Sequence, residues 1–248
     1  MAMWSPAGHR DDAELDRILD FRAERALGHV TALAKGRTQR TCPICGYTGM
    51  FSPVRHKPEI WCPSCDSRPR HRLLKLWMDR EMALPKQADV IHFAAEPWVR
   101  AEMEARGARY RTADINALFD LRLDITDMDL ADASIDMIMA NHVLEHVDDQ
   151  KALTEIYRVL RPGGQAVITV PIYEGVDETY ENPAHATAEA RALYYGDKDH
   201  VRLYGRDFRD RFAAPGFQLA EFTALEPYAA QYGLHRGEKV FVGMKGAP

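Results

Sequence analysis

The chain has 248 residues, of which 46% are hydrophobic and 28% charged, and its formal net charge is −5. The apolar fraction is too high for a disordered chain, and the length fits one large domain that carries a small module. No apolar run approaches the roughly 20 residues that cross a bilayer, and the N-terminus lacks the apolar stretch of a secretory signal. These features predict a cytoplasmic protein with no membrane contact.

The charge is divided unevenly along the chain. Residues 1–80 hold 14 basic and 9 acidic residues, a net charge of +5, whereas residues 81–248 hold 18 and 28, a net charge of −10. The whole chain is too acidic to coat nucleic acid by bulk charge, but the basic first part leaves a local contact with phosphates open.

The first predicted element is an amphipathic helix over residues 11–34, where Leu15, Leu19, Leu27 and Val30 recur at near-helical intervals. We therefore assign residues 1–40 to an N-terminal helical segment.

All four cysteines lie in residues 41–67, as Cys42-Pro-Ile-Cys45 and Cys62-Pro-Ser-Cys65, with sixteen residues between the pairs. Two cysteines three positions apart on a tight turn can direct both thiolates at one ion, and two such turns complete a closed tetrahedral shell. The spacing predicts a structural zinc ribbon. Two disulfides, a redox pair and an iron–sulfur cluster are the competing interpretations, of which the first suits a secreted chain and the second would not be duplicated.

A connecting helix is predicted over residues 68–87. It begins with the basic run Arg68-Pro-Arg70-His-Arg72 and continues with an apolar stripe that includes Leu73 and Trp77. The cations either face an anionic substrate or RNA phosphates, or they form an ordinary solvated face.

From residue 88 onward, strand-length apolar runs alternate with helix-like stretches. This succession predicts an α/β fold with a mostly parallel sheet and helices on both faces, which binds ligands at the carboxyl ends of its strands. Two final runs predict a closing antiparallel pair. The predicted strands cover residues 90–94, 110–115, 121–125, 135–140, 166–170, 217–225 and 239–244, and the helix-like stretches cover 98–106 and 149–160.

The most specific motifs follow the fourth of these strands. Asn141-His-Val-Leu-Glu-His146-Val comes directly after it, and Arg161-Pro-Gly-Gly164 follows the next helix. The Pro-Gly-Gly predicts a turn that stops this helix and begins a strand. In this order and spacing, residues 88–246 resemble a class I S-adenosylmethionine-dependent methyltransferase. The resemblance implies a doubly wound, mostly parallel, seven-stranded Rossmann-like sheet over residues 88–248, with S-adenosylmethionine as cofactor.

The resemblance also implies cofactor-binding residues, position by position. Asp114 would accept the ribose hydroxyls, Asp124 and Ile125 would contact the adenine, and Asn141 and His142 would lie near the methionine part and the transferred methyl group.

The loop after the first strand departs from the family pattern. It reads Phe93-Ala94-Ala95-Glu96, with no glycine between residues 50 and 106, where the family usually has a glycine-rich loop. The two alanines are small, and Glu96 is placed to pair with the cofactor's ammonium group. The departure leaves open a weaker cofactor affinity or a pocket without activity.

Acceptor-side candidates lie in an insertion over residues 171–206. His200 is the first candidate for a general base, Arg202 for holding a carboxylate or phosphate, and Tyr204 and His142 complete the catalytic set. The alternative is that His200 and Arg202 brace the insertion against the sheet.

Three functions follow from these patterns. The first is a methyltransferase acting on an O or N atom of a small-molecule metabolite. The second is an RNA methyltransferase that grips RNA with the zinc ribbon and the basic residues 68–75, although the acidity of residues 81–248 opposes a polyanion at the site. The third is a non-catalytic adaptor with a degenerate cofactor loop.

Overall fold

The computed structural model describes residues 39–54, 57–116 and 118–246, together with Ala23, Leu27 and Val30. The chain divides into two compact units, of which one comprises Met1–Lys75 and Leu225–Arg236 and the other Leu76–Ala224 and Gly237–Pro248. The helix predicted over residues 11–34 lies outside the described residues, apart from these three, which are helical. None of the helices in the described part is both long and apolar enough to cross a bilayer.

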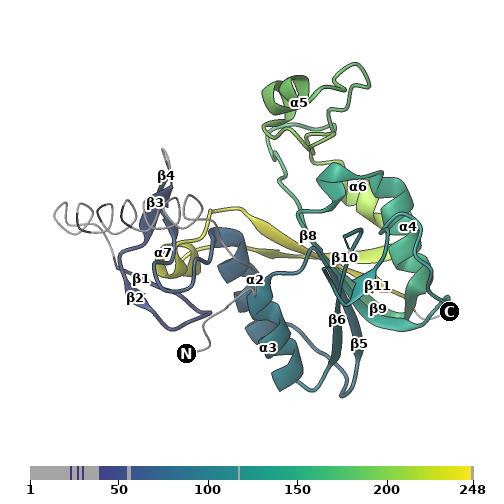
Figure 1. Ribbon diagram of the computed structural model, residues 1–248, viewed down its shortest axis with the longest axis horizontal. Coiled ribbons are helices and arrows are strands. Elements are labelled where there is room, and N and C mark those ends of the chain that lie inside the picture. Colours follow the sequence, from purple (N-terminus) through teal and green to yellow (C-terminus); the bar gives the residue numbers. More distant parts are fainter. Residues whose placement is uncertain are drawn as a thin grey trace. The chain divides into compact units, whose positions relative to one another are not determined.

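The first unit contains two small antiparallel pairs around the cysteines (Figure 1). Strand β1 (Arg40–Thr41) pairs with β2 (Thr48–Gly49), and β3 (Ser52–Val54) pairs with β4 (Lys57–Trp61). The same unit includes the short helix α7 (Tyr228–Tyr232). Helix α2 (Pro69–Arg80) replaces the longer connecting helix that was predicted, and it belongs to this unit only up to Lys75.

One arginine of the basic run is buried and hydrogen-bonded inside this unit. Arg72 is fully buried, and its guanidinium lies 4.4 Å from the centre of the Phe51 ring. It donates to the carbonyl oxygens of Ser67, Tyr232 and Gly233, at 2.5, 2.7 and 2.7 Å. Because these bonds use the cation internally, Arg72 is not part of a solvated or phosphate-facing surface.

The second unit is built on a seven-stranded sheet in the order β10-β11-β9-β8-β5-β6-β7. Strands β5 to β9 are parallel, and β11 is antiparallel to both β9 and β10, which confirms the predicted mostly parallel sheet with its closing pair. The strands are β5 (Asp89–Phe93), β6 (Arg109–Asp114), β7 (Leu121–Arg122), β8 (Ile135–Asn141), β9 (Leu160–Thr169), β10 (Phe217–Thr223) and β11 (Lys239–Lys245).

Helices cover both faces of this sheet, with α3 (Pro97–Ala105) on one face and α4 (Asp149–Val159) and α6 (Phe208–Ala213) on the other (Figure 1). Asp148 caps the N-terminus of α4, because its side chain accepts a hydrogen bond from the Lys151 backbone N–H. Its buried face packs into a core with the central strands, and burying each such apolar side chain contributes about 1.5–3 kcal/mol. That face consists of Ala152, Leu153, Ile156 and Val159.

The Pro-Gly-Gly motif does not stop helix α4, contrary to the prediction. The helix ends at Val159 and strand β9 begins at the next residue, Leu160. Leu160 pairs with Ile135 and Gln165 pairs with Met137, so the chain advances five residues along β9 where it advances two along β8. The motif is therefore a bulge within the strand. Gly163 adopts φ +81°, a left-handed conformation that favours glycine.

The segment between β9 and α6 contains helix α5 (Ala188–Tyr195) and two isolated bridges, Ile172 with Tyr204 and Tyr180 with Leu203. These bridges tie the two ends of the predicted insertion to each other.

Candidate active site

The carboxyl ends of β5, β6 and β8 form one edge of the sheet, at the point where the strand order reverses. Phe93 pairs with Ala113 of β6 and with Ala140 of β8. The residues that follow these three therefore lie at the same level of the edge, and they are Ala94, Asp114 and Asn141. Open α/β sheets bind their ligands at such a switch point.

The glycine-free loop begins in a conformation that glycine normally takes. Ala94 has φ +48°, and its backbone N–H donates to the Ala113 carbonyl oxygen at 3.1 Å. A left-handed conformation costs a residue with a Cβ roughly 1 kcal/mol. The loop thus passes through a left-handed residue without a glycine, at some cost in stability.

A buried polar chain orients Glu96 at this edge. His92, on the central strand β5, is fully buried, with Nδ1 2.8 Å from the Tyr110 hydroxyl and Nε2 3.1 Å from Glu96 Oε2. Asn141 Nδ2 donates to the same carboxylate oxygen at 3.2 Å, and Thr169 Oγ1 donates to Asn141 Oδ1 at 3.3 Å. The tautomer with the proton on Nε2 lets His92 donate to Glu96 and accept from Tyr110 at Nδ1, and Asn141 Nδ2, which lies 3.2 Å from the same Nε2, then donates to Glu96 instead of to the ring.

Burial raises the pKa of the Tyr110 phenol far above its usual range, so this hydroxyl remains a donor to His92. His92 was not among the site residues predicted from the sequence. The available signal was a histidine inside the otherwise apolar run Val90–Ala94.

The two predicted aspartates each close a local turn. Asp114 Oδ1 accepts from the backbone N–H of Asn116 at 2.9 Å, and Asp124 Oδ1 accepts from that of Thr126 at 2.8 Å. Asp124 is exposed, whereas Ile125 is only 4% exposed and packs in the sheet core. Ile125 therefore offers little surface to an adenine ring.

His142 follows β8 with φ +54°, and its backbone N–H donates to the Thr169 carbonyl oxygen at 2.8 Å. Its ring Nδ1 lies 2.9 Å from Oε1 of Glu145, which is fully buried in the 3-10 turn η1 (Leu144–His146). Thr169 thus fixes the backbone of His142, and Glu145 fixes its ring, at the predicted cofactor edge.

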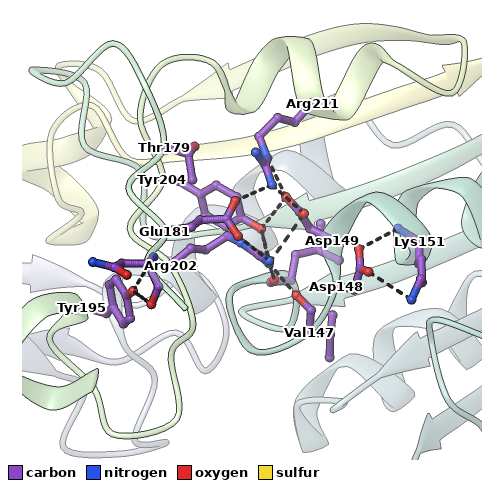
Figure 2. Close-up of polar contacts among 12 residues, drawn as sticks. Val147, Asp148, Asp149, Lys151, Thr179, Glu181, Tyr195, Arg202, Tyr204 and Arg211 are labelled. Atoms are coloured by element: carbon purple, nitrogen blue, oxygen red, sulfur yellow. Dashed lines mark hydrogen bonds and ion pairs between the residues drawn. The ribbon is translucent and has the colours of Figure 1, made fainter. Parts of the chain in front are cut away.

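Tyr204 does not fit the catalytic role predicted for it. Figure 2 shows its side chain within a polar cluster, where its hydroxyl lies 3.1 Å from the Leu144 carbonyl oxygen and 3.1 Å from Asp149 Oδ2. The residue is fully buried, and burial raises the pKa of its phenol well above the usual range. A protonated, buried hydroxyl cannot serve as a base for an external substrate.

Arg202 belongs to the same cluster and does not fit a substrate-holding role. It is 6% exposed and donates to the carbonyl oxygens of Leu144 and Val147 and to Glu181 Oε2 (Figure 2). Its guanidinium also lies 3.7 Å from Asp149. These contacts are internal, so the arrangement supports the alternative in which Arg202 braces the insertion.

An open cleft of about 410 Å³ lies beside this cluster. Its lining includes His146, Glu181 and Arg211, and the last of these forms a two-point ion pair with Asp149 at 2.8 Å. His200, the predicted base, stands next to His146, with their ring centres 4.8 Å apart. Neither Glu145 nor His146 was predicted from the sequence as a site residue, although their position three and four residues after His142 was a usable signal.

In the first unit, the four cysteine sulfurs converge, with one ligand atom of each within 4.8 Å of the others. The Sγ atoms of Cys42 and Cys65 are 3.6 Å apart, as are those of Cys45 and Cys62, and all four thiols are free. Zinc–sulfur bonds of about 2.3 Å in a tetrahedron hold their sulfurs ~3.8 Å apart. The cluster fits a zinc ion and does not contain the alternative disulfides.

Comparisons with known proteins concern mainly the sheet unit. A family model described as a methyltransferase domain matches residues 86–168. An uncharacterized methyltransferase of Mycobacterium sp. (strain KMS) is 31% identical over 115 residues, which cover 46% of this chain and 44% of the relative. An arsenite methyltransferase of Aquipseudomonas alcaligenes is 25% identical, over 55% of this chain and 48% of the relative. The chain thus spans less than half of the length of these relatives.

Among solved structures, an S-adenosylmethionine-dependent methyltransferase from Mesorhizobium loti has the same fold, with a TM-score of 0.51 and 13% identity. The superposition covers 69% of this chain and 97% of that structure.

Proposed function

We propose that the chain, which contains a class I S-adenosylmethionine-dependent methyltransferase domain, transfers a methyl group to an O or N atom of a small-molecule metabolite. The observation that carries the proposal is the alignment of Ala94, Asp114 and Asn141 at the switch point of the sheet. S-adenosylmethionine, when bound, supplies an electrophilic methyl group on a sulfonium.

The cofactor-side roles follow from the positions of the polar groups. Glu96 is held by His92 and Asn141, so its carboxylate is fixed before an ammonium group arrives and loses little freedom on binding. Asp114 would accept the ribose hydroxyls, and the exposed Asp124 would accept the adenine amine.

The acceptor side requires alignment of the nucleophile, exclusion of water and, for some acceptors, removal of a proton. Of the predicted catalytic set, Arg202 and Tyr204 act as internal braces, so His142 and His200 are the two members left for a role on the acceptor side. We place the acceptor on the side of the edge where His142 and His200 lie.

The RNA alternative loses support, because Arg72 of the basic residues 68–75 is buried and bonded within its own unit. Labelled S-adenosylmethionine distinguishes the two substrate classes. Incubated with the protein and with separated RNA and metabolite fractions of a cell extract, the labelled methyl group is expected in the metabolite fraction. Label in RNA alone, or in neither fraction, would contradict the proposed acceptor class.

We propose further that Cys42, Cys45, Cys62 and Cys65 hold a structural zinc ion. Among the described residues, the apolar cluster around the cysteines has Cys42, Phe51 and Cys62 as its fully buried members, so an ion that joins the four thiolates would contribute much of the stability of this small cluster. Replacing Cys62 with Ser should remove one zinc ion per chain in elemental analysis, whereas replacing the exposed Ser64 with Ala should remove none. Equal zinc content in both variants would contradict the site.

A further inference from the structure

Three metal-ligating side chains converge beside the cofactor edge, in a group separate from the cysteines. Glu145 and His146 belong to the turn η1 after strand β8, and His200 belongs to the insertion after β9. One ligand atom of each residue lies within 4.8 Å of those of the other two. All three belong to the sheet unit.

The hydrogen bonds of the two imidazoles match those that metal-bound histidines usually make. Nδ1 of His146 lies 3.1 Å from the Asp199 carbonyl oxygen, and Nδ1 of His200 lies 3.3 Å from the Tyr195 carbonyl oxygen. A carbonyl oxygen only accepts hydrogen bonds, so each Nδ1 carries the proton and each Nε2 presents its lone pair. Metal-bound histidines characteristically donate their other N–H to a carbonyl or carboxylate in this way.

Glu145 provides the second, independent observation. The residue is 0% exposed, and its Oε1 is held by His142 Nδ1 at 2.9 Å. Its Oε2 is buried and has no hydrogen-bond partner among the described residues. A buried carboxylate oxygen without a partner is costly, and a cation at this position would remove the cost.

The main chain also fixes the two parts of the cluster to each other. The Val201 N–H donates to the Glu145 carbonyl oxygen at 2.9 Å, and Arg202 donates to the carbonyl oxygens of Leu144 and Val147. The residues that follow His200 are therefore bonded to the residues that flank Glu145 and His146. This gives the buried Arg202 a purpose as a positioning residue.

From these contacts we propose that Glu145, His146 and His200 bind one divalent transition-metal ion. Two imidazoles and one carboxylate form the ligand set of many catalytic zinc and iron sites, which leave further coordination positions open. Bond lengths of about 2.0–2.2 Å place tetrahedral ligand atoms ~3.4 Å apart, so each side chain moves inward by less than ~1 Å. An open coordination position would bind an oxygen or nitrogen of the methyl acceptor, and this role of the ion rests on the proposed function.

Cobalt(II) tests the site in the full chain after the cysteine cluster has been loaded with zinc. We expect one Co²⁺ per chain, with visible d–d absorption and without the thiolate charge-transfer band that exchange into the cysteine cluster would produce. Glu145→Gln and His146→Ala should each weaken Co²⁺ binding at least tenfold. His146 is exposed, so its variant keeps the fold even if the buried Glu145 variant does not.

The matched control is His185→Ala, which removes another histidine of the insertion, one whose ring stacks on Tyr194 at 3.8 Å. Its Co²⁺ affinity should equal that of the wild type. Absence of Co²⁺ binding outside the cysteine cluster, or equal affinity in His146→Ala and the control, would overturn the proposal. The readout needs neither S-adenosylmethionine nor an acceptor, so it fails or succeeds independently of the proposed methyl transfer.

Discussion

At the scale of single residues, the cofactor loop depends on one alanine in a conformation that suits glycine. The missing glycines are visible in the sequence, the strands follow from hydrophobic periodicity, and the seven-stranded sheet follows from the family resemblance. The positive φ of Ala94, +48°, is not visible there, because the backbone conformation at this residue is imposed by the pairing of β5 with β6. The same holds for His92, whose partners Tyr110 and Asn141 come from the two neighbouring strands.

Replacing Ala94 with Gly should therefore be tolerated. Removing the Cβ relieves the left-handed strain, which offsets the greater freedom of glycine in the unfolded chain, so the free energy of unfolding should stay the same or rise by up to about 1 kcal/mol. Urea denaturation measures this. Ala95→Gly is the control, because Ala95 has no positive φ. This substitution should lower the free energy of unfolding by about 0.5–1 kcal/mol. A larger loss in Ala94→Gly than in Ala95→Gly would contradict the account.

A second residue-scale prediction concerns Asp89 at the start of β5. Its carboxylate accepts from Arg109 Nε at 2.9 Å and Nη2 at 2.7 Å, and this guanidinium is the main reason that the pKa of Asp89 lies below its usual value. A depressed carboxyl pKa stabilises the fold above the unfolded value near 3.9, and the contribution is lost as the pH falls through the folded value.

Asp89→Asn should accordingly lower the free energy of unfolding by about 1 kcal/mol at pH 7, and the difference from wild type should shrink below about pH 4. Asp132→Asn is a suitable control, because Asp132 is 78% exposed in its ion pair with Arg158. A difference for Asp89→Asn that is constant from pH 7 to pH 3 would contradict this electrostatic origin.

At the scale of elements, the sequence predicted the strands and helices better than the joints between them. Local turn chemistry pointed to a helix stop at Pro162-Gly163-Gly164, whereas the structure has a bulge there, since the pairing of Ile135 with Leu160 begins the strand immediately after the helix. Long-range pairing decided this joint. Long-range contacts also fix the insertion, because the carbonyl oxygens that accept from Arg202 lie 55 and 58 positions away in the chain.

Arg202→Ala should lower the free energy of unfolding by about 3 kcal/mol or more, because it leaves Asp149 and the carbonyl oxygens of Leu144 and Val147 with fewer partners in a buried cluster. Arg206→Ala removes an exposed arginine of the same segment and should change the stability by less than about 1 kcal/mol. Thermal unfolding followed by circular dichroism measures both. Equal stability of the two variants would contradict the bracing role of Arg202 and would favour the role of a substrate contact.

At the scale of the whole molecule, the division of the chain by charge, at residue 80, differs from its division into two compact units. Residues Leu225–Arg236 group with the cysteine-containing unit, although they lie 160 positions beyond the last cysteine. Arg72 bonds to Tyr232 and Gly233 of this segment. No local pattern in the sequence indicates such a pairing.

Calorimetry on the zinc-loaded protein shows whether the glycine-free edge binds S-adenosylmethionine. We expect one site per chain for S-adenosylmethionine and one for its demethylated product. Glu96→Gln should weaken the binding of both at least tenfold, and Glu104→Gln, on the exposed side of α3, should leave it unchanged. No binding heat at millimolar ligand, or equal affinity in the two variants, would contradict this expectation.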